Sequence, residues 1–295
     1  MTDIVRMKGI ILAGGKGTRL YPVSFPISKS LMPIYNKPMI YYPLSTLMLA
    51  GIEDILIITN ERDHGNYKTM LGDGSMFGIK LSYAIQYEPK GIADAFIIGK
   101  EFIGGDKVTL ILGDNIFHGE SMMSLLEKAM KFKKGCVIFV FRVPDPERFG
   151  VAELDGEKNV LSLEEKPKHP KSNCAVTGLY MYDSDVCKIA ASLKPSKRGE
   201  LEITDLNKIY LQRKSLKAYV MGGGYMWMDA GTYDSLCDAS VAVRDIEIKK
   251  RRMISCPEEI ALMKGFITSK ELKERIKDED SIYYEDLRKI ADEYP

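Results

Sequence analysis

The sequence predicts an α/β protein with a mostly parallel central sheet. In the first half of the chain, apolar runs of about six residues alternate with segments of helical periodicity, the pattern of βαβ units whose strands are buried on both faces. From about residue 144, short strands separated by turns replace this alternation, and from Tyr233 onward the pattern is helical. We therefore expect one core domain, residues 7–232, with a β-rich lobe at about 144–200, and a helical appendage of the same domain at 233–295.

The expected elements follow one another along the chain in a regular order. Prolines between residues 22 and 38 exclude a single helix there, because proline lacks the amide hydrogen that a helix interior needs. The predicted strands lie at 8–13, 54–59, 81–86, 107–112, 136–142, 150–154, 159–164, 175–182, 216–221 and 225–229. The predicted helices of the core lie at 39–50, 63–71, 91–102, 122–132 and 203–212.

Composition and charge exclude several classes of protein. A formal net charge of +1 argues against a nucleic-acid-binding or anionic-membrane-binding surface. The 5 cysteines are odd in number and form no C-x-x-C pair, which favours reduced thiols in a cytoplasmic protein. The 3 histidines lack metal-ligand spacing, so zinc chemistry and a histidine-based triad are not expected. We find no apolar run near the ~20 residues of a membrane helix and no signal peptide. Residues 1–6 precede a second methionine, Met7, so either methionine could be the native start.

The turn after the first predicted strand is the strongest candidate for a binding site. Gly14, Gly15 and Gly17 break the apolar run, and Lys16 and Arg19 are set among them. Glycines let the backbone turn several N–H groups toward one point, which is how such turns bind anions. This turn is either a nucleotide phosphate site or an ordinary glycine-rich connection between a strand and a helix.

Two common phosphate-binding motifs do not fit this turn. A P-loop requires G-x-x-x-x-G-K-[ST], which the chain lacks, and a dinucleotide fingerprint requires a third glycine where Leu20 stands. A mononucleotide kinase and an NAD-type oxidoreductase are therefore disfavoured. The element is instead G-G-x-G-T-R-L, in which Arg19 offers a planar, permanently charged fork suited to a polyphosphate.

Polar residues recur after the later strands, where open α/β sheets bind their ligands. Asp114 and Asp229 each follow an apolar strand and together form a plausible Mg²⁺ pair, although each alone is more typical of a turn. Glu165 and Lys166 form either a surface ion pair or a carboxylate for sugar hydroxyls beside a lysine for a phosphate. We expect Trp227, the only tryptophan, to lie in the core with partial exposure.

Six motifs in order resemble those of the glucose-1-phosphate thymidylyltransferases, the short bacterial form also called dTDP-glucose pyrophosphorylase. The resemblance extends from about Met7 to at least Ile267, and residues 195–205 (P-S-K-R-G-E-L-E-I-T-D) also match. The motifs are G-G-K-G-T-R-L (14–20), S-K-S-L-M-P-I (28–34), K-P-M-I-Y-Y-P-L (37–44), L-G-D-N (112–115), L-E-E-K-P (163–167) and W-M-D-A-G-T (227–232).

The resemblance implies a Rossmann-like nucleotide-diphospho-sugar transferase fold, in which the β-rich lobe binds sugar and the C-terminal helices make tetramer contacts. It implies that glucose 1-phosphate attacks the α-phosphorus of dTTP with the help of Mg²⁺, giving dTDP-glucose and pyrophosphate. This reaction needs no general base, because a phosphate dianion is already a nucleophile, and the enzyme aligns the reactants and neutralises charge. The implied setting is the first step of dTDP-deoxysugar biosynthesis of the dTDP-rhamnose type, used for lipopolysaccharide and O-antigen.

The resemblance also assigns roles to individual residues. The implied catalytic residues are Arg19, Lys29 and Lys166. The implied nucleotide-binding residues are Leu12, Gly14, Gly15, Gly17, Gln86, Gly91 and Asp114, with Gln86 and Gly91 reading the thymine edge. The implied sugar-phosphate-binding residues are Asn115, Gly150, Glu165, Lys166, Val176 and Arg198. Asp114 and Asp229 would bind the Mg²⁺ ion.

The chain departs from typical relatives at a second nucleotide pocket that serves feedback inhibition in rhamnose-pathway members. Gly223, His118 and Met263 stand where those relatives carry arginine, tyrosine and arginine, whereas Ser255 and Glu259 remain. Losing a charged hydrogen-bond partner costs about 1.5–3 kcal/mol, so we expect weak or altered feedback by dTDP-rhamnose. Phe149 and Ala230 also replace a tyrosine and a threonine of typical relatives.

Three alternatives to this function remain from the sequence. The first is the same chemistry with UTP or another hexose 1-phosphate, since the thymine methyl and the missing 2′-hydroxyl are small features. The second is a non-catalytic sugar-nucleotide sensor, disfavoured because the implied catalytic and metal-binding side chains are all present. The third is the NAD-type oxidoreductase, disfavoured by Leu20.

Overall fold

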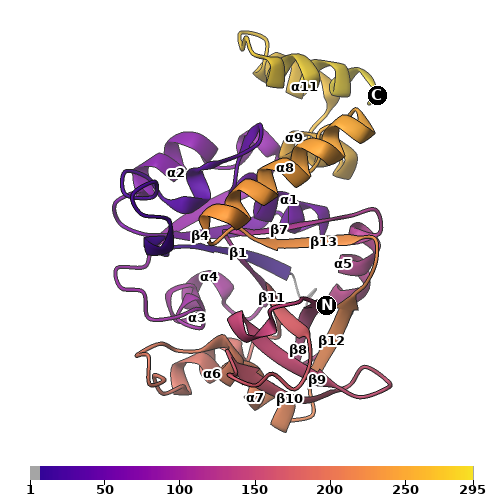
Figure 1. Cartoon of the computed structure of the whole chain (residues 1–295). Coiled ribbons are helices and arrows are strands. Elements are labelled where there is room, and N and C mark those ends of the chain that lie inside the picture. Colours follow the sequence, from indigo (N-terminus) through magenta and orange to yellow (C-terminus); the bar gives the residue numbers. More distant parts are fainter. Residues whose placement is uncertain (1–6, 295) are drawn as a thin grey trace.

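A nine-stranded sheet forms the centre of the molecule (Figure 1). We analysed a computed structural model that describes residues 7–294, so the predicted optional segment 1–6 lies outside the described residues. The strands, in spatial order, run β10-β9-β11-β6-β1-β4-β5, and β8 and β12 extend the sheet from β11. Their bounds are β1 Met7–Ala13, β4 Asp54–Thr59, β5 Lys80–Ile85, β6 Lys107–Leu112, β8 Cys136–Arg142, β9 Gly150–Leu154, β10 Val160–Glu165, β11 Cys174–Tyr182 and β12 Leu216–Met221.

The first half of the chain builds the parallel part of this sheet. β1 pairs in parallel with β4 and with β6, and β4 pairs in parallel with β5. β12 is likewise parallel to β8. β11 runs antiparallel to β6, β8 and β9, and thereby joins the β-rich lobe to the parallel strands without a break in the sheet. The predicted α/β class with a mostly parallel central sheet is confirmed.

Helices cover both faces of the sheet and extend beyond its edge. The α-helices are α1 Tyr41–Leu49, α2 His64–Leu71, α3 Ala95–Ile98, α4 Lys100–Ile103, α5 Met122–Met130, α6 Val186–Ser192, α7 Ile203–Gln212, α8 Tyr233–Lys250, α9 Pro257–Lys264, α10 Ser269–Arg275 and α11 Ile282–Asp292. Four 3₁₀ turns are η1 Thr18–Leu20, η2 Lys29–Leu31, η3 Ser75–Phe77 and η4 Pro146–Arg148. Two short ladders complete the fold, β2 Pro33–Ile34 with β3 Lys37–Pro38, and β7 Asn115–Gly119 with β13 Tyr225–Asp229. None of the helices within 7–294 has the length and apolar character needed to cross a bilayer.

The structure corrects three sequence-based expectations about secondary structure. The predicted helix 91–102 is wrong: residues 91–94 form a bend and a turn, and the remainder is divided at Gly99 into α3 and α4. The turn is held by Leu201, whose carbonyl accepts the Ala93 N–H. β7 and α6 were not predicted, because a strand that begins with Asn115 and a helix of seven residues give weak periodic signals.

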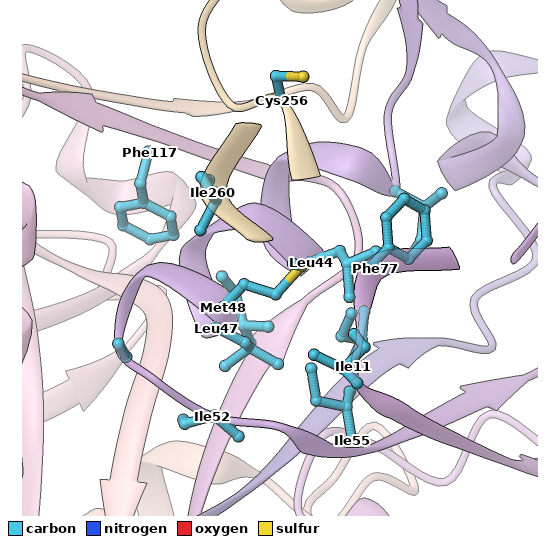
Figure 2. Close-up of a cluster of buried hydrophobic side chains, with 14 of the residues drawn as sticks. Ile11, Leu44, Leu47, Met48, Ile52, Ile55, Phe77, Phe117, Cys256 and Ile260 are labelled. Atoms are coloured by element: carbon cyan, nitrogen blue, oxygen red, sulfur yellow. The ribbon is translucent and has the colours of Figure 1, made fainter. Parts of the chain in front are cut away.

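The core consists of two apolar layers, one on each face of the sheet. Along β1, Ile10 belongs to one layer and Ile11 to the other, because successive side chains of a strand point to opposite faces. Figure 2 shows Leu44, Leu47 and Met48 of α1 beside Ile11 of β1, with Ile260 of α9 on their other side. α9 therefore packs directly on a core helix.

The last helices are arranged around this core in two ways. α8 packs on the β2–β3 hairpin and β13, and Ala239 and Val243 of α8 share a third apolar cluster with Tyr42 of α1. α9, α10 and α11 pack on one another at one end of the molecule, opposite β9, β10 and α7 (Figure 1). The C-terminal helices α8–α11 are therefore tied to the core through α8 and α9, and the division into a core at 7–232 and an appendage at 233–295 stays a prediction.

Candidate active site

The glycine turn after β1 has close contacts at Gly14 and Gly17, whereas the space around Gly15 is open. Gly17 has φ +63°, in the left-handed region that favours glycine, and it begins η1, which carries Arg19. A Cβ on Gly14 would lie 2.9 Å from Oε1 of Gln86, the residue that follows β5. The glycines therefore bring the first and third predicted strand ends into contact, as the carboxyl-end rule for parallel sheets requires.

Two adjoining cavities open at these strand ends and share the side chain of Asp114. The glycine-side cavity is lined by Leu12, Ala13, Gly15, Ser28, Lys29, Ser30, Gln86, Pro89, Gly91, Ile92, Leu112, Asp114 and Glu200. The lobe-side cavity is lined by Arg19, Ile92, Leu112, Asp114, Asn115, Arg148, Phe149, Gly150, Glu165, Lys166, Val176, Gly178, Tyr180, Arg198, Glu200, Glu202, Ile203, Thr204, Trp227 and Asp229. Of the predicted site residues, Gly14 and Gly17 line neither cavity and act through the shape of the turn.

Asp114 and Asp229 are brought together by the β7–β13 ladder. Asp229 pairs in register with Asn115, and the Ala230 N–H donates to the Asp114 carbonyl at 3.1 Å. Burial, followed by the negative charge of Asp114, raises the pKa of Asp229 to about 7. Burial would also raise the pKa of Asp114, but the charge and hydrogen bond of Lys29 outweigh it and hold that pKa below its ordinary value. These opposite shifts keep Asp114 ionised and favour the proton on Asp229 when no metal is bound.

This pair has the chemistry that a divalent cation requires. Lys29 of η2 forms an ion pair with Asp114, and Arg19 lies close enough to Asp229 to lower its pKa. Two neighbouring carboxylates supply the hard oxygen donors that Mg²⁺ prefers. Among residues 7–294 no cluster of three or more histidine, cysteine or acidic side chains is arranged to hold a metal.

Asn115 organises the wall between the two cavities. Its Oδ1 accepts hydrogen bonds from the Trp227 indole N–H at 2.6 Å and the Gly178 N–H at 3.0 Å, and its Nδ2 donates to Asp114 at 3.0 Å. Trp227 is 9% exposed and packs edge-on against Phe149, as expected of a core tryptophan that reaches a cavity. Asn115 thus positions Asp114, and its contact with a hexose stays a prediction.

The floor of the lobe-side cavity joins β9, β10 and α7. Thr204 Oγ1 donates to Glu165 Oε2 at 2.5 Å, and a Cβ on Gly150 would lie 3.0 Å from Thr204 Oγ1. Lys166 has φ +44°, a left-handed conformation that costs a non-glycine residue about 1–3 kcal/mol. Its N–H donates to the Phe149 carbonyl at 3.0 Å, which holds the exposed Lys166 side chain at the rim of the cavity.

A strap of backbone crosses between the two cavities. The Leu201 N–H donates to the Lys90 carbonyl at 2.7 Å, and the Ala93 N–H donates to the Leu201 carbonyl at 3.2 Å. Gly91 has φ +102°, and a Cβ there would lie 2.5 Å from the Leu201 carbonyl oxygen. Gln86 Nε2 donates to Asp94 at 2.9 Å. Gly91 is therefore required by the strap itself, and the reading of a thymine edge by Gln86 and Gly91 stays a prediction.

Sequence reasoning singled out Arg198 but missed its partners. The Arg198 guanidinium pairs with Glu200 at 2.7 Å and Glu202 at 3.1 Å, so its charge is compensated in this structure. Arg148 and Thr204 also line the cavity. Thr204 lies in the matched stretch 195–205, and Arg148 immediately precedes Phe149-Gly150. Both residues are therefore near quoted motifs, but their spacing in the sequence does not indicate that they line the cavity.

The residues of the expected feedback pocket also lie together, apart from both cavities. His118, Ser255, Glu259 and Met263 line a pocket between β7 and α9, and His118 and Gly223 line an adjacent one. Lys250 of α8 lies in both, within 3.4 Å of His118 Nε2. A cationic residue is thus still present where two family arginines are missing.

The fold and the site define a class of protein, and comparison with known proteins agrees. The family model described as "Nucleotidyl transferase" matches residues 8–246, and the chain belongs to that family. Within it, the chain is 54% identical over 271 residues to a glucose-1-phosphate thymidylyltransferase of Neisseria gonorrhoeae, covering 92% of this chain and 94% of that protein. It is 52% identical over 272 residues to a glucose-1-phosphate thymidylyltransferase of Mycolicibacterium smegmatis, with the same coverage. Its particular family is therefore that of the glucose-1-phosphate thymidylyltransferases, as its motifs predicted.

Solved structures show the same architecture. A candidate glucose-1-phosphate thymidylyltransferase from Bacillus anthracis, in complex with sucrose, superposes with a TM-score of 0.76 at 44% identity, covering 81% of this chain and 96% of that one. A UDP-glucose pyrophosphorylase complexed with UDP-glucose gives 0.71 at 26% identity, covering 82% and 100%. The predicted nucleotide-diphospho-sugar transferase fold is confirmed.

Proposed function

We propose that this chain transfers a thymidylyl group from dTTP to glucose 1-phosphate, giving dTDP-glucose and pyrophosphate. The observation that carries the proposal is the pair of adjoining cavities that share Asp114, with Lys29 on one side and Arg19 and Lys166 on the other. A triphosphate in the glycine-side cavity and a sugar phosphate in the lobe-side cavity would meet at this carboxylate. The relatives named above support the choice of dTTP and glucose 1-phosphate.

The reaction is an in-line displacement at phosphorus. An oxygen of the sugar phosphate forms a bond to the α-phosphorus of dTTP, and the bond to the bridging oxygen breaks, so that pyrophosphate leaves with the electron pair. Lys166 would hold the attacking phosphate, while Arg19 and Lys29 would stabilise the charge that develops on pyrophosphate. Asp114 and Asp229 would hold a Mg²⁺ ion, whose charge would neutralise that of the phosphates.

Several finer points belong to the same proposal. We infer a cytoplasmic homotetramer, and the five cysteines, which are free thiols and mostly buried, support a reducing compartment. The expected pathway is dTDP-deoxysugar biosynthesis. Use of UTP is the second candidate, because a UDP-glucose pyrophosphorylase shares the fold at 26% identity.

The test is release of pyrophosphate across a matrix of four nucleoside triphosphates and several sugar phosphates, with and without Mg²⁺. We expect the highest kcat/KM with dTTP and glucose 1-phosphate, and no turnover after chelation of the metal. A higher kcat/KM with UTP would show that UTP, the second candidate, is the nucleotide substrate in place of dTTP. Binding of sugar nucleotides without turnover of any pair would identify a sensor and refute the proposed enzyme.

A further inference from the structure

The loop between β4 and α2 braces the segment that carries two of the proposed catalytic cations. Arg62 lies in this loop and does not line either cavity. One of its guanidinium N–H groups donates to the Phe25 carbonyl at 2.6 Å, and two others donate to Oδ2 of the buried Asp63 at 2.7 and 2.8 Å. Residues 24–25 are thereby tied to the end of a central strand.

The contact continues from Ser24 to the glycine turn. Ser24 is fully buried, and its hydroxyl donates to the Gly17 carbonyl at 2.6 Å. Gly17 precedes η1, and the Leu20 N–H donates to the same carbonyl at 2.9 Å. A continuous set of hydrogen bonds therefore connects Asp63 through Arg62 and residues 24–25 to the turn that presents Arg19.

Tyr67 makes the equivalent contact on the Lys29 side. It lies on α2, is fully buried, and hydrogen-bonds through its hydroxyl to Ser28 Oγ at 2.9 Å. Ser28 immediately precedes Lys29, so this buried phenol holds the residue next to the cation.

We propose that Arg62 and Tyr67 are positioning residues, which set Arg19 and Lys29 at the distance where both reach the same polyphosphate. This inference rests on the proposed function. Neither residue touches the reacting groups, and neither belongs to the motifs that identify the family. A misplacement of about 1 Å at a catalytic group costs roughly 100-fold in rate, so residues that hold the segments carrying both cations have a direct effect on turnover.

Tyr67→Phe isolates the phenol hydroxyl without changing packing. The probe is inorganic triphosphate, which engages the cations whatever the true base and sugar are, and its Kd is measured by calorimetry. We expect Kd to rise about 5- to 10-fold in Tyr67→Phe, and kcat to fall by a similar factor while KM for glucose 1-phosphate stays unchanged. The matched control is Tyr210→Phe, which removes a buried hydroxyl that donates to Asp183 at 2.8 Å elsewhere in the fold.

A double-mutant cycle separates positioning from general stability. If Tyr67 acts through Lys29, then Tyr67→Phe has no further effect on triphosphate binding in a Lys29→Met background, although it lowers the thermal midpoint equally in both backgrounds. The second cycle pairs Arg62→Lys, which keeps a cation for Asp63 but shortens the fork, with Arg19→Met. In that cycle too we expect the binding losses not to add.

Each outcome decides the inference. The positioning role would be refuted if Tyr67→Phe bound triphosphate with wild-type affinity, or if it lost equal affinity with and without Lys29→Met. It would also be refuted if Tyr210→Phe lost as much affinity as Tyr67→Phe, or if the wild-type chain bound no triphosphate. Suppose that Tyr67→Phe weakens triphosphate binding only when Lys29 is present, and that the wild-type chain does not turn over dTTP. This result would support the positioning role of Tyr67 and refute the proposed function.

Discussion

The carboxyl group of Asp229 lies beside that of Asp114, whose negative charge helps to raise the pKa of Asp229. They follow different strands of one short ladder, whose register places Asp229 opposite Asn115. The main sheet alone would bring only Asp114 to the site, at the end of β6. β13 returns from the second half of the chain to supply the other carboxylate.

Asp114→Asn and Asp229→Asn should each lower Mg²⁺-dependent turnover at least about 100-fold, because each removes one of two hard ligands for the metal. Folding should be retained. At pH 8 the thermal midpoint of Asp229→Asn should be no lower than that of the wild type, since the substitution removes repulsion between two buried carboxylates. Asp106→Asn, which removes a partly exposed carboxylate paired with Lys8, is the control and should keep full activity. Full activity in either site variant would refute the metal assignment.

Metal affinity should depend on pH in a defined direction. The pKa of Asp229 is about 7 without metal, and a bound cation requires the ionised carboxylate. Binding of Mn²⁺, measured by calorimetry, should therefore release a proton and strengthen by up to about 10-fold per pH unit below pH 7, with a plateau above it. Because this pKa is raised above that of the unfolded chain, the metal-free protein should lose stability as pH rises from about 4 to 7. Affinity that is constant from pH 5.5 to 8 would contradict the raised pKa of Asp229.

Gly91→Ala should weaken binding of the nucleotide and lower stability. The position has φ +102°, and the new Cβ would press on the Leu201 carbonyl oxygen, so the strap between residues 90–93 and Leu201 must open. The control is Gly104→Ala, which has φ +59° but whose new Cβ has its nearest neighbour at 4.0 Å, so it reports backbone strain without the clash. We expect KM for dTTP to rise at least about 5-fold in Gly91→Ala only. Equal KM values in the two variants would show that the strap is not needed for binding.

Lys37→Met should destabilise the fold by about 3–5 kcal/mol, because it leaves the carboxylate of Glu247 buried without a cation. Lys37 has a fully buried side chain, and its ammonium contacts Glu247 at 2.6 Å, joining the β2–β3 hairpin to α8. The double variant Lys37→Met/Glu247→Leu should recover part of the loss in chemical denaturation. Lys8→Met, in a partly exposed pair, should cost less than about 1 kcal/mol. A small effect of Lys37→Met would mean that water reaches Glu247.

Feedback inhibition by dTDP-rhamnose should be weak, and Gly223→Arg should strengthen it at least about 10-fold, the equivalent of one charged hydrogen bond. An arginine fits there, because a Cβ on Gly223 meets no atom within 4 Å and its φ is not positive. Gly222→Arg is equally open and serves as the control, with no expected change. Wild-type inhibition as strong as in typical relatives would refute this prediction.

The sequence by itself determined the local elements and the candidate residues. Uncharged runs such as 55–59 and 108–112 are strands wherever both faces are buried, so the bounds of these strands could be predicted closely. The rule that parallel strands end at one edge then indicated Asp114, Lys166 and the glycine turn. Motif resemblance supplied the substrates, which periodicity alone does not reveal.

Tertiary structure alone decided which of these residues meet. The division of the predicted helix 91–102, the β7–β13 ladder, the Thr204–Glu165 hydrogen bond and the Arg62–Tyr67 brace all depend on partners distant in sequence. A local sequence pattern does not predict such partners, because burial and hydrogen bonding between distant segments arise only once the sheet has assembled. The two aspartates could be identified in the sequence, but their proximity follows from the fold.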